Sequence, residues 1–291
     1  METHLPDTMT NQRRFAVFGH PVAHSLSPAM HNANFQALGL EATYEKRDID
    51  SVAAFYAALA DYRQGGVNCT IPLKRIAFEN CDHLDSTAQR FGVVNTIRFN
   101  PDATTTGFNT DGTGFLQSLQ EELHTTPSGQ SLFIFGCGGA GRAIAITCAD
   151  AGATRIVLAN RSTTRMETLA AELTLLTPQV TIETTLSTPA AWAQACRTCD
   201  LIVQCSSVGL HPRDTSPLPQ NAFHSRQKLY DLIYNTPATP TMIAARAAGA
   251  QTANGLGMLI HQGAASFTIW TGLQANVSAM RHALMASLPH S

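Results

Sequence analysis

Charged residues are scarce in this 291-residue sequence: only 14% of the positions are Asp, Glu, Lys or Arg, and the formal net charge is -2. The sequence has no long basic run, so it lacks the electrostatic footprint of a nucleic-acid-binding protein. It also lacks an apolar stretch of the roughly 18 residues that a membrane-spanning helix requires. Its first residues are polar and show no apolar centre of a signal peptide. Because residues 1–12 precede the first predicted strand, we expect them to be loose. We therefore expect a soluble, cytoplasmic protein that binds neither nucleic acid nor a membrane.

The cysteines offer no disulfide framework, because there are seven of them and most fall within predicted strands and helices. Only Cys196 and Cys199 show a CxxC spacing, and neither a second pair nor a histidine doublet completes a zinc set. We expect reduced, buried thiols and no bound metal.

Hydrophobic residues make up 44% of the chain, enough to build two ordinary domains. Strand patterns and helix patterns alternate along the first part, which predicts an α/β fold with parallel sheets. The predicted strands are 14–19, 43–49, 66–70 and 93–99, and the predicted helices are 27–38, 52–62 and one starting at Pro72.

The alternation restarts at residue 131 and predicts a second α/β unit. Its predicted strands are 131–135, 155–159, 180–184, 200–205 and 228–234, with a helix at 142–151 after the first of them. Thr239 and Pro240 look like the cap and first residue of another helix. The segment 256–288 looks helical throughout.

Gly136, Gly138 and Gly141 form a G-x-G-x-x-G pattern directly after a predicted strand and directly before a predicted helix. This context is typical of dinucleotide binding, because missing side chains let the backbone approach a pyrophosphate while the helix N-terminus favours its negative charge. The alternative is a glycine-rich turn without a ligand.

The second strand of this unit is followed by Asn160, Arg161 and Ser162 instead of the Asp or Glu that holds the ribose hydroxyls of NAD. Arg161 and Arg165 can each bind a 2'-phosphate through charge-assisted hydrogen bonds. If each contact contributes ~1.5 kcal/mol, the pair favours NADP by about a hundredfold. The alternative is that both arginines are solvated residues at a helix start.

Three polar clusters remain outside the cofactor unit. Ser25 and Ser27 lie at a strand-to-helix junction that suits a carboxylate, although Ser27 could be only a helix N-cap. Lys74 follows the end of a strand, where ligands of α/β sheets bind, although it could be a surface lysine. Asp111 lies in an Asn-Thr-Asp-Gly segment that could be only a turn and helix cap.

In chain order the motifs read HSLSPAMHN, VNCTIPLK, VNT, GFNTDG, GCGGAGRA, NRS, SSVGL, DLIYNTPATP and NGLGMLIHQGA. They cover nearly the whole chain, and together they resemble the shikimate dehydrogenase family. The resemblance implies a two-domain α/β protein. Residues 1–110 and 255–291 would form an α/β substrate domain to which the C-terminal helices return, and residues 111–254 would form a doubly wound, Rossmann-type NADP-binding domain.

The resemblance also implies the roles of individual residues. Ser25 and Ser27 would hold a substrate carboxylate, and Lys74 and Asp111 would carry the proton chemistry. Other substrate contacts, to carboxylate or hydroxyls, would come from Asn68, Thr70, Asn95, Tyr234 and Gln262. The cofactor would contact Gly136, Cys137, Gly138, Gly139, Ala140, Gly141, Asn160, Arg161, Ser162, Arg165, Leu232 and Gly255.

The implied reaction is the NADPH-dependent, reversible reduction of 3-dehydroshikimate to shikimate in aromatic amino-acid biosynthesis. Hydride transfer to a ketone leaves an alkoxide, so a proton donor must lie at that oxygen. Lys74 can stabilise the developing charge while Asp111 positions the lysine, and the sequence leaves open which of the two transfers the proton. It also leaves open whether the protein is a monomer or a homodimer.

Two further features lie near these motifs. Cys137 stands where alanine is more common in the family, and a thiol there could make the enzyme sensitive to thiol reagents. For His24, His31 and His261 we expect structural hydrogen bonds and no catalytic role.

Two rival hypotheses remain. A quinate/shikimate dehydrogenase that uses NAD would have the same fold and motifs, but an acidic residue is missing between Asn160 and Arg165. A non-catalytic NADP-binding sensor would have no need of Lys74 and Asp111.

Overall fold

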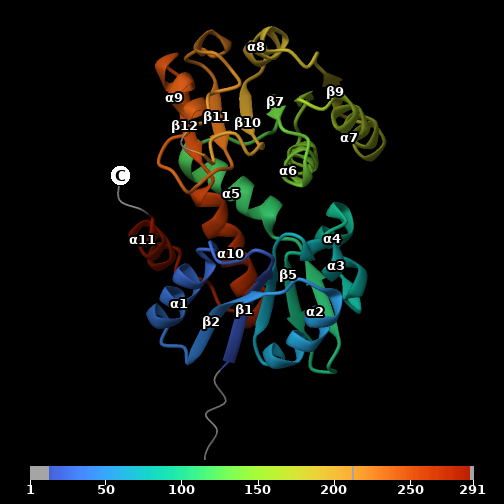
Figure 1. The fold of residues 1–291 in the computed structure, drawn as a ribbon, viewed down its shortest axis with the longest axis vertical. Coiled ribbons are helices and arrows are strands. Elements are labelled where there is room, and N and C mark those ends of the chain that lie inside the picture. The colour runs from blue at the N-terminus through green and yellow to red at the C-terminus, as the bar shows by residue number, and fades with distance from the viewer. Residues whose placement is uncertain (1–12, 212, 289–291) are drawn as a thin grey trace, which may run out of the picture. The chain divides into compact units, whose positions relative to one another are not determined.

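The computed structural model describes residues 13–211 and 213–288, which divide into two compact units. One unit contains the chain up to Asn109 together with Ser266–Ser287, and the other contains Thr110–Ala265 (Figure 1). This division of the chain falls inside a helix, α10 (Leu256–Thr271). The expectation that residues 1–12 are loose lies outside the described residues. Within them, no helix is both long and apolar enough to cross a membrane.

The first unit is built on a six-stranded sheet with the order β2-β1-β3-β5-β6-β4. Its strands are β1 (Arg13–Gly19), β2 (Ala42–Asp48), β3 (Gly66–Cys69), β4 (His83–Leu84), β5 (Thr96–Phe99) and β6 (Thr105–Phe108). The sheet is mixed, because β5 runs antiparallel to both β3 and β6. The prediction of parallel sheets is therefore correct for β1, β2 and β3 but wrong for β5. A short loop joins β5 to β6, and so short a connection permits only antiparallel pairing.

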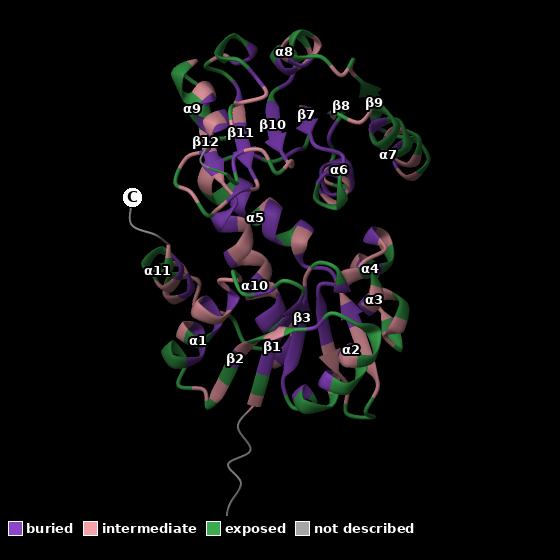
Figure 2. Ribbon diagram, viewed as in Figure 1, coloured by how far each residue is buried: buried purple, intermediate pink, exposed green. Residues whose placement is uncertain are grey.

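The helices of this unit cover the two faces of the sheet and bury its alternating side chains. They are α1 (Ser27–Ala37), α2 (Val52–Leu59) with the 3-10 turn η1 (Ala60–Tyr62), α3 (Leu73–Asn80), α4 (Ser86–Phe91) and α11 (Val277–Ser287). Strand β1 sends Phe15 into one apolar cluster with Trp270 and sends Phe18 into another with Tyr62. This period of two explains why β1 is buried along most of its length (Figure 2).

The second unit contains a six-stranded sheet with the order β12-β11-β10-β7-β8-β9, and all its pairs are parallel. Its strands are β7 (Ser131–Phe135), β8 (Arg155–Ala159), β9 (Thr181–Thr184), β10 (Leu201–Gln204), β11 (Lys228–Asp231) and β12 (Gln251–Asn254). Its other elements are α5 (Asp111–Leu123), α6 (Gly139–Asp150), α7 (Thr163–Leu176), α8 (Pro189–Arg197), η2 (Gln220–Ala222), α9 (Pro240–Ala247) and most of α10. Counted along the chain, the strand order is 6-5-4-1-2-3. This is the doubly wound arrangement, whose switch point lies between β7 and β10.

The predicted elements agree with the structure where local signals are strong and differ at their ends. Thr239 caps α9 as predicted, since its hydroxyl accepts a hydrogen bond from the Met242 N–H. Ser27 is not the N-cap of α1: Leu26 takes that place and Ser27 is the first helical residue. The segment 256–288 is not helical throughout, because α10 ends at Thr271 and Gly272 adopts a positive φ of 71°.

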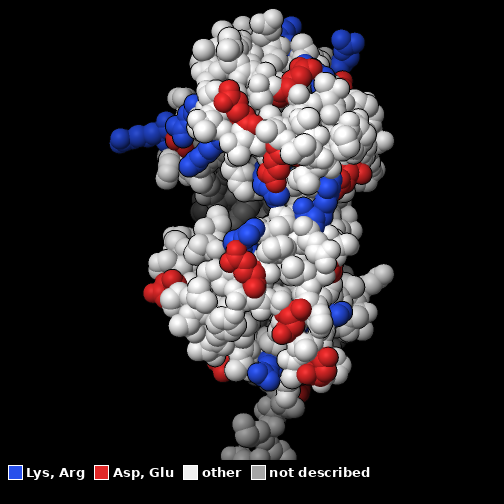
Figure 3. Space-filling model, turned by 90° about the vertical axis from the view of Figure 1, so that its right-hand side faces the viewer, with Lys and Arg blue, Asp and Glu red and all other residues white. Residues whose placement is uncertain are grey.

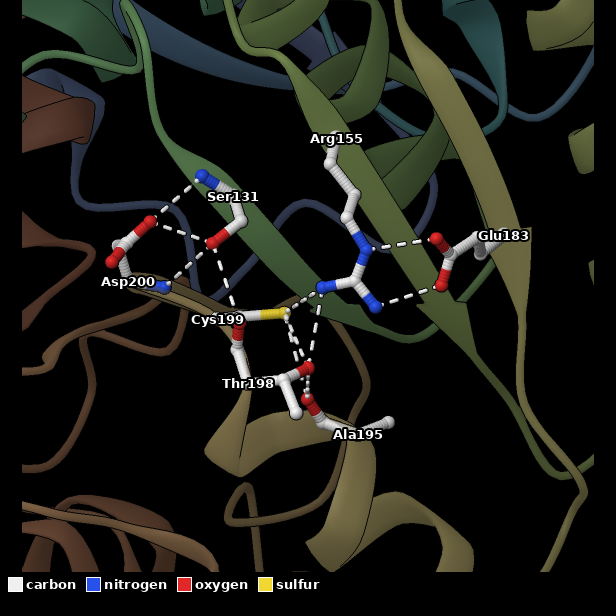
Figure 4. A network of polar contacts seen from close by, with 7 residues as sticks. All are labelled: Ser131, Arg155, Glu183, Ala195, Thr198, Cys199 and Asp200. Atoms are coloured by element: carbon white, nitrogen blue, oxygen red, sulfur yellow. Dashed lines mark hydrogen bonds and ion pairs between the residues drawn. The ribbon is translucent and has the colours of Figure 1, made fainter.

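A polar network closes the amino ends of β7, β8 and β10, as Figure 4 shows. The Ser131 hydroxyl donates to Asp200 at 2.6 Å, and Arg155 on β8 makes two hydrogen bonds with Glu183 on β9, of 2.9 and 2.7 Å. Arg155 also donates to the sulfur of Cys199 at 3.6 Å. Cys199 therefore belongs to the packing of this sheet edge, at the opposite end from the glycine-rich turn. No group of three metal-ligating side chains occurs in the described part of the chain.

Charged side chains are sparse on the face that Figure 3 shows, and acidic and basic groups are interspersed there. The surface thus matches the low charge content of the sequence.

Candidate active site

The glycine-rich turn between β7 and α6 is shaped by two glycines that the fold itself requires. Gly136 has a φ of 107°, and a Cβ there would lie 2.7 Å from the backbone nitrogen of Ser206. A Cβ at Gly141 would lie 1.8 Å from the carbonyl oxygen of Gly136. Only glycine therefore allows the turn to bend and α6 to pack this closely against it.

Gly138 and Gly139 serve a different purpose, because the protein's own packing does not require them. Gly138 is the N-cap of α6 with a negative φ of -87°, and a Cβ at either glycine would meet no atom within 4 Å. The helix start also has no side-chain cap. The missing side chains leave room in front of the N–H groups of a twelve-residue helix, which is the arrangement that binds a pyrophosphate. Ala140 follows as the next residue of the helix.

Cys137 lies inside the turn but is buried, and burial raises the pKa of its thiol to about 11. Its backbone N–H donates to the side-chain oxygen of Asn160 at 3.4 Å, which ties the turn to the end of β8. A buried thiol with a raised pKa is a poor nucleophile. The structure thus argues against the expected sensitivity to thiol reagents at this position.

The segment after β8 presents two basic side chains to solvent. Asn160 donates to the carbonyl oxygen of Ser162 at 3.0 Å, and the Ser162 hydroxyl caps α7 by accepting from the Arg165 N–H. Arg161 and Arg165 are exposed. Among residues 13–211 and 213–288, no ion pair involves either guanidinium. Both are therefore available to an anionic group of a ligand.

Leu232 and Gly255 meet through their backbones beyond the carboxyl end of β11. A Cβ at Gly255 would lie 2.1 Å from the carbonyl oxygen of Leu232, so the close approach of the two chains explains this glycine. Leu232 in turn donates its N–H to the carbonyl of Gln204 at the end of β10. The pair lies at the edge of the sheet where ligands of doubly wound folds bind.

The loop after β11 carries Tyr234 and is held by a buried carboxyl group. Asp231 accepts hydrogen bonds from the Thr239 hydroxyl at 2.6 Å and from the Ile233 N–H at 3.1 Å. Desolvation raises the pKa of Asp231 to about 6. Burial also raises the pKa of Tyr234.

In the first unit, Ser25 and Ser27 lie together at the start of α1. The Ser25 hydroxyl donates to the Ser27 oxygen at 3.2 Å and accepts from the Ser27 N–H at 3.3 Å. Ser27 is buried. The pair thus forms a small hydroxyl cluster at a helix N-terminus, as the sequence predicts for an anion-binding junction.

Asn68 is the centre of a buried polar network. Its side-chain oxygen accepts from the Tyr44 hydroxyl at 2.7 Å. Its amide nitrogen lies 3.0 Å from each of three acceptors: the Asn95 carbonyl, the Thr96 hydroxyl and the Ser266 hydroxyl. Sequence reasoning found Asn68 and Asn95 but missed Tyr44, Thr96 and Ser266.

Thr70 and Lys74 lie beside this network, at the end of β3 and the start of α3. The Thr70 carbonyl accepts from Leu73, which closes the turn into the helix. Lys74 is half-buried, and its charge opposes the burial that raises the pKa of Cys69. The Lys74 carbonyl accepts the N–H of Val94, which places the lysine next to the segment that carries Asn95.

Asp111 is the first residue of α5, and Gln262 lies on α10 in the same unit. A Cβ at Gly114 would lie 2.6 Å from the Gln262 nitrogen, so the two helices pack closely there. Residues three apart on a helix share a face, so Asp111 lies on the α10 side of α5. Because Lys74 belongs to the other unit, its pairing with Asp111 stays a prediction.

The expectation of a structural hydrogen bond fails at His31. His31 is fully buried, and neither ring nitrogen has a hydrogen-bond partner among the described residues. It stacks on Tyr44 with ring centroids 4.3 Å apart, and burial lowers its pKa to about 3. The expected structural hydrogen bond of His31 is therefore wrong. His261 does form one, with Glu121.

Two models of known protein families match this chain, one near each end. The family model described as the shikimate dehydrogenase substrate binding domain matches residues 17–97, and the one described as the shikimate 5'-dehydrogenase C-terminal domain matches residues 255–285. A shikimate dehydrogenase (NADP(+)) from Methanopyrus kandleri is 41% identical over 276 residues, which cover 94% of each chain.

Solved structures resemble the chain over a similar length. The crystal structure of shikimate 5-dehydrogenase from Thermus thermophilus in complex with NADP(H) and shikimate has a TM-score of 0.82 and 37% identity, covering 94% of this chain and 99% of that one. The structure of quinate dehydrogenase from Corynebacterium glutamicum in complex with NAD has a TM-score of 0.85 and 26% identity, covering 94% and 98%.

Proposed function

Because this chain belongs to the shikimate dehydrogenase family, we propose that it catalyses the reversible, NADPH-dependent reduction of 3-dehydroshikimate to shikimate. The observation that carries the proposal is its similarity to NADP(+)-dependent shikimate dehydrogenases along nearly the whole chain. The chain carries both Lys74 and Asp111, to which we assign the proton chemistry. The reaction belongs to aromatic amino-acid biosynthesis.

The second unit has the features that NADP requires. The open space at Gly138 and Gly139 and the uncapped start of α6 fit a pyrophosphate. The exposed Arg161 and Arg165 fit a 2'-phosphate, and no carboxylate stands between them to repel it. Around these residues we assign Gly136, Cys137, Ala140, Gly141, Asn160, Ser162, Leu232 and Gly255 to the cofactor site.

On the substrate side, Ser25 and Ser27 bind the carboxylate through hydroxyl groups at the start of α1. Asn68 was expected to contact the carboxylate or a hydroxyl of the substrate, but both hydrogens of its amide are already shared among three protein acceptors. Only its oxygen has capacity left, so it can accept from a ring hydroxyl but cannot donate to a carboxylate. We assign the remaining contacts to Thr70, Asn95, Tyr234 and Gln262.

The chemical step needs a proton at the oxygen that becomes the new hydroxyl. NADPH, when bound, supplies the hydride. The Lys74 ammonium stabilises the negative charge that develops on the carbonyl oxygen, and a proton passes to that oxygen from the pair formed by Lys74 and Asp111. Asp111 orients the lysine and accepts from a neighbouring hydroxyl of the substrate.

The domain limits, location and assembly follow from the same proposal. Residues 1–110 and 255–291 form the substrate domain, and residues 111–254 form the NADP-binding domain. The protein acts in the cytoplasm as a monomer or homodimer, on a small-molecule substrate and without nucleic acid.

A second candidate is an NAD-dependent quinate/shikimate dehydrogenase, favoured by the structural similarity to a quinate dehydrogenase in complex with NAD. The residues after β8 favour NADP, because an acidic side chain for the ribose hydroxyls is missing between Asn160 and Arg165.

The test is a spectrophotometric assay of the purified protein with shikimate or quinate, each with NADP and with NAD. We expect the highest kcat/KM for shikimate with NADP. A preference for quinate or NAD would support the second candidate, and no turnover in any combination would leave a nucleotide-binding sensor.

A further inference from the structure

A row of polar side chains crosses one buried face of the first unit's sheet. In the register of the sheet Phe15 pairs with Tyr44, Val17 pairs with Asn68, and Asn68 pairs with Thr96. Partners in register point to the same face, so all five lie on the face that carries Phe15. That face is otherwise apolar. Most polar groups buried in folded proteins have hydrogen-bond partners.

The directions of these hydrogen bonds follow from donor and acceptor capacity. The Asn95 carbonyl can only accept, so the group of Asn68 that faces it is the amide nitrogen. The Asn68 oxygen therefore faces Tyr44, whose single hydrogen is donated to it. The Tyr44 hydroxyl therefore holds the Asn68 oxygen, and its own oxygen has no further hydrogen to donate.

The Tyr44 hydroxyl thus contacts Asn68, a residue that we assign to the substrate site, and holds its side-chain oxygen. The Ser266 hydroxyl holds the amide nitrogen of Asn68 from the opposite side. The ring of Tyr44 is fixed independently, by stacking on His31 at an interplanar angle of 6°. Removing the hydroxyl alone therefore leaves the ring's packing in place.

We propose that Tyr44 and Ser266 are positioning residues of the substrate site, an inference that rests on the proposed function. They hold the Asn68 side chain so that its oxygen meets a hydroxyl of the substrate. Neither residue needs to touch the substrate for this role. Without the Tyr44 hydroxyl, the buried Asn68 oxygen loses a hydrogen-bond donor, and the side chain is held through its amide nitrogen alone.

The experiment compares Tyr44→Phe with Tyr62→Phe and the wild-type protein. Tyr62 is equally buried in the same unit, but it belongs to the apolar cluster on the other face and bonds to Glu45 and Arg47. For Tyr44→Phe we expect the KM for shikimate to rise about tenfold, the ratio that corresponds to 1.4 kcal/mol. We expect kcat and the KM for NADP to change less than about twofold, as for the loss of an interaction that is equally strong in the ground state and the transition state. Tyr62→Phe should lower the melting temperature and leave all three constants unchanged.

The outcomes separate this inference from the function on which it rests. Turnover of shikimate by the wild-type protein tests the function, and its absence would overturn both. With an active wild type, an unchanged KM in Tyr44→Phe, or an equal rise in Tyr62→Phe, overturns the positioning role. If Tyr44→Phe does not fold, Ser266→Ala decides: we expect about a threefold rise in the KM for shikimate alone, and an unchanged KM contradicts the proposal.

Discussion

The buried His31 makes the stability of the first unit depend on pH in a way that can be measured. Both ring nitrogens are enclosed by Phe35, Tyr44 and Trp270, and neither has a hydrogen-bond partner among residues 13–211 and 213–288. Burial lowers the pKa of His31 to about 3, whereas a histidine in an unfolded chain has a pKa of about 6.5. Between about pH 6.5 and pH 3, the histidine is protonated in the unfolded state but stays neutral in the folded state.

The magnitude follows from proton linkage. A depressed pKa in the folded state gives stability that is fully present above about pH 6.5 and is lost as the pH falls toward 3. Between its pKa of about 6.5 and pH 5, the histidine of the unfolded state takes up one proton over about 1.5 pH units. The free energy of unfolding therefore falls by ~2 kcal/mol between pH 7.5 and pH 5. In His31→Phe this loss should disappear. The free energy of unfolding of the wild type, minus that of the variant, should therefore fall by ~2 kcal/mol over this range.

The assay is urea unfolding followed by tryptophan fluorescence, in a Trp192→Phe background. The chain has two tryptophans, and Trp270 lies 5.7 Å from the His31 ring, so its emission then reports on this cluster. Phe35→Leu is the matched control, since it disturbs the same cluster without changing a titratable group. A difference between wild type and His31→Phe that stays constant from pH 7.5 to 5 would refute the reasoning.

Three further perturbations test other parts of the account. Lys74→Ala should lower kcat by about 10²- to 10⁴-fold without weakening NADP binding, and a fluorescence titration with NADPH that shows weaker binding would point to a structural role. Arg161→Ala combined with Arg165→Ala should raise the KM for NADPH by about a hundredfold but hardly change that for NADH. Arg226→Ala, exposed in the same unit, is its control, and an unchanged cofactor preference in the double variant would contradict the assignment. The pKa of Asp231 is raised to about 6, so its ionisation above that pH costs stability in the folded state. The free energy of unfolding of the wild type, minus that of Asp231→Asn, should therefore fall by ~2 kcal/mol as the pH rises from 4.5 to 7. Urea unfolding at both pH values measures this, and the opposite trend would mean that hydrogen bonding outweighs desolvation.

The sequence predicts the cofactor unit well because its signals are local. The glycines, the strand before them and the strand after α6 follow one another within about thirty residues, the span of a βαβ unit. The strand 131–135 and the strand 155–159 have the predicted limits in the structure. The helix between them begins at Gly139 and not at residue 142 as predicted. The prediction placed the start too late because glycine has a low helix propensity, so the glycines of the first turn give no helix signal.

The substrate side was predicted only in part, for a physical reason. Ser25, Asn68 and Lys74 belong to recognisable motifs, but Tyr44 and Ser266 contact Asn68 from positions 24 and 198 residues away in the chain. No periodic pattern indicates such contacts. Tyr44 could have been suspected from strand pairing alone, because the register places it and Asn68 on one face of the sheet.

The antiparallel end of the first sheet was missed because β6 is short and polar at its start, so it gives no strand signal. Similarly, α10 and α11 read as one helix because the chain between them has only Gly272 as a strong interruption.

The most direct measurement of the central claim is a crystal structure of the complex with NADP and shikimate. We expect the side chains of Lys74 and Asp111 to lie within hydrogen-bond distance of the substrate hydroxyl that faces the nicotinamide, and Arg161 and Arg165 to contact the 2'-phosphate. If Lys74 and Asp111 instead point away from that hydroxyl, the proposed proton chemistry is contradicted.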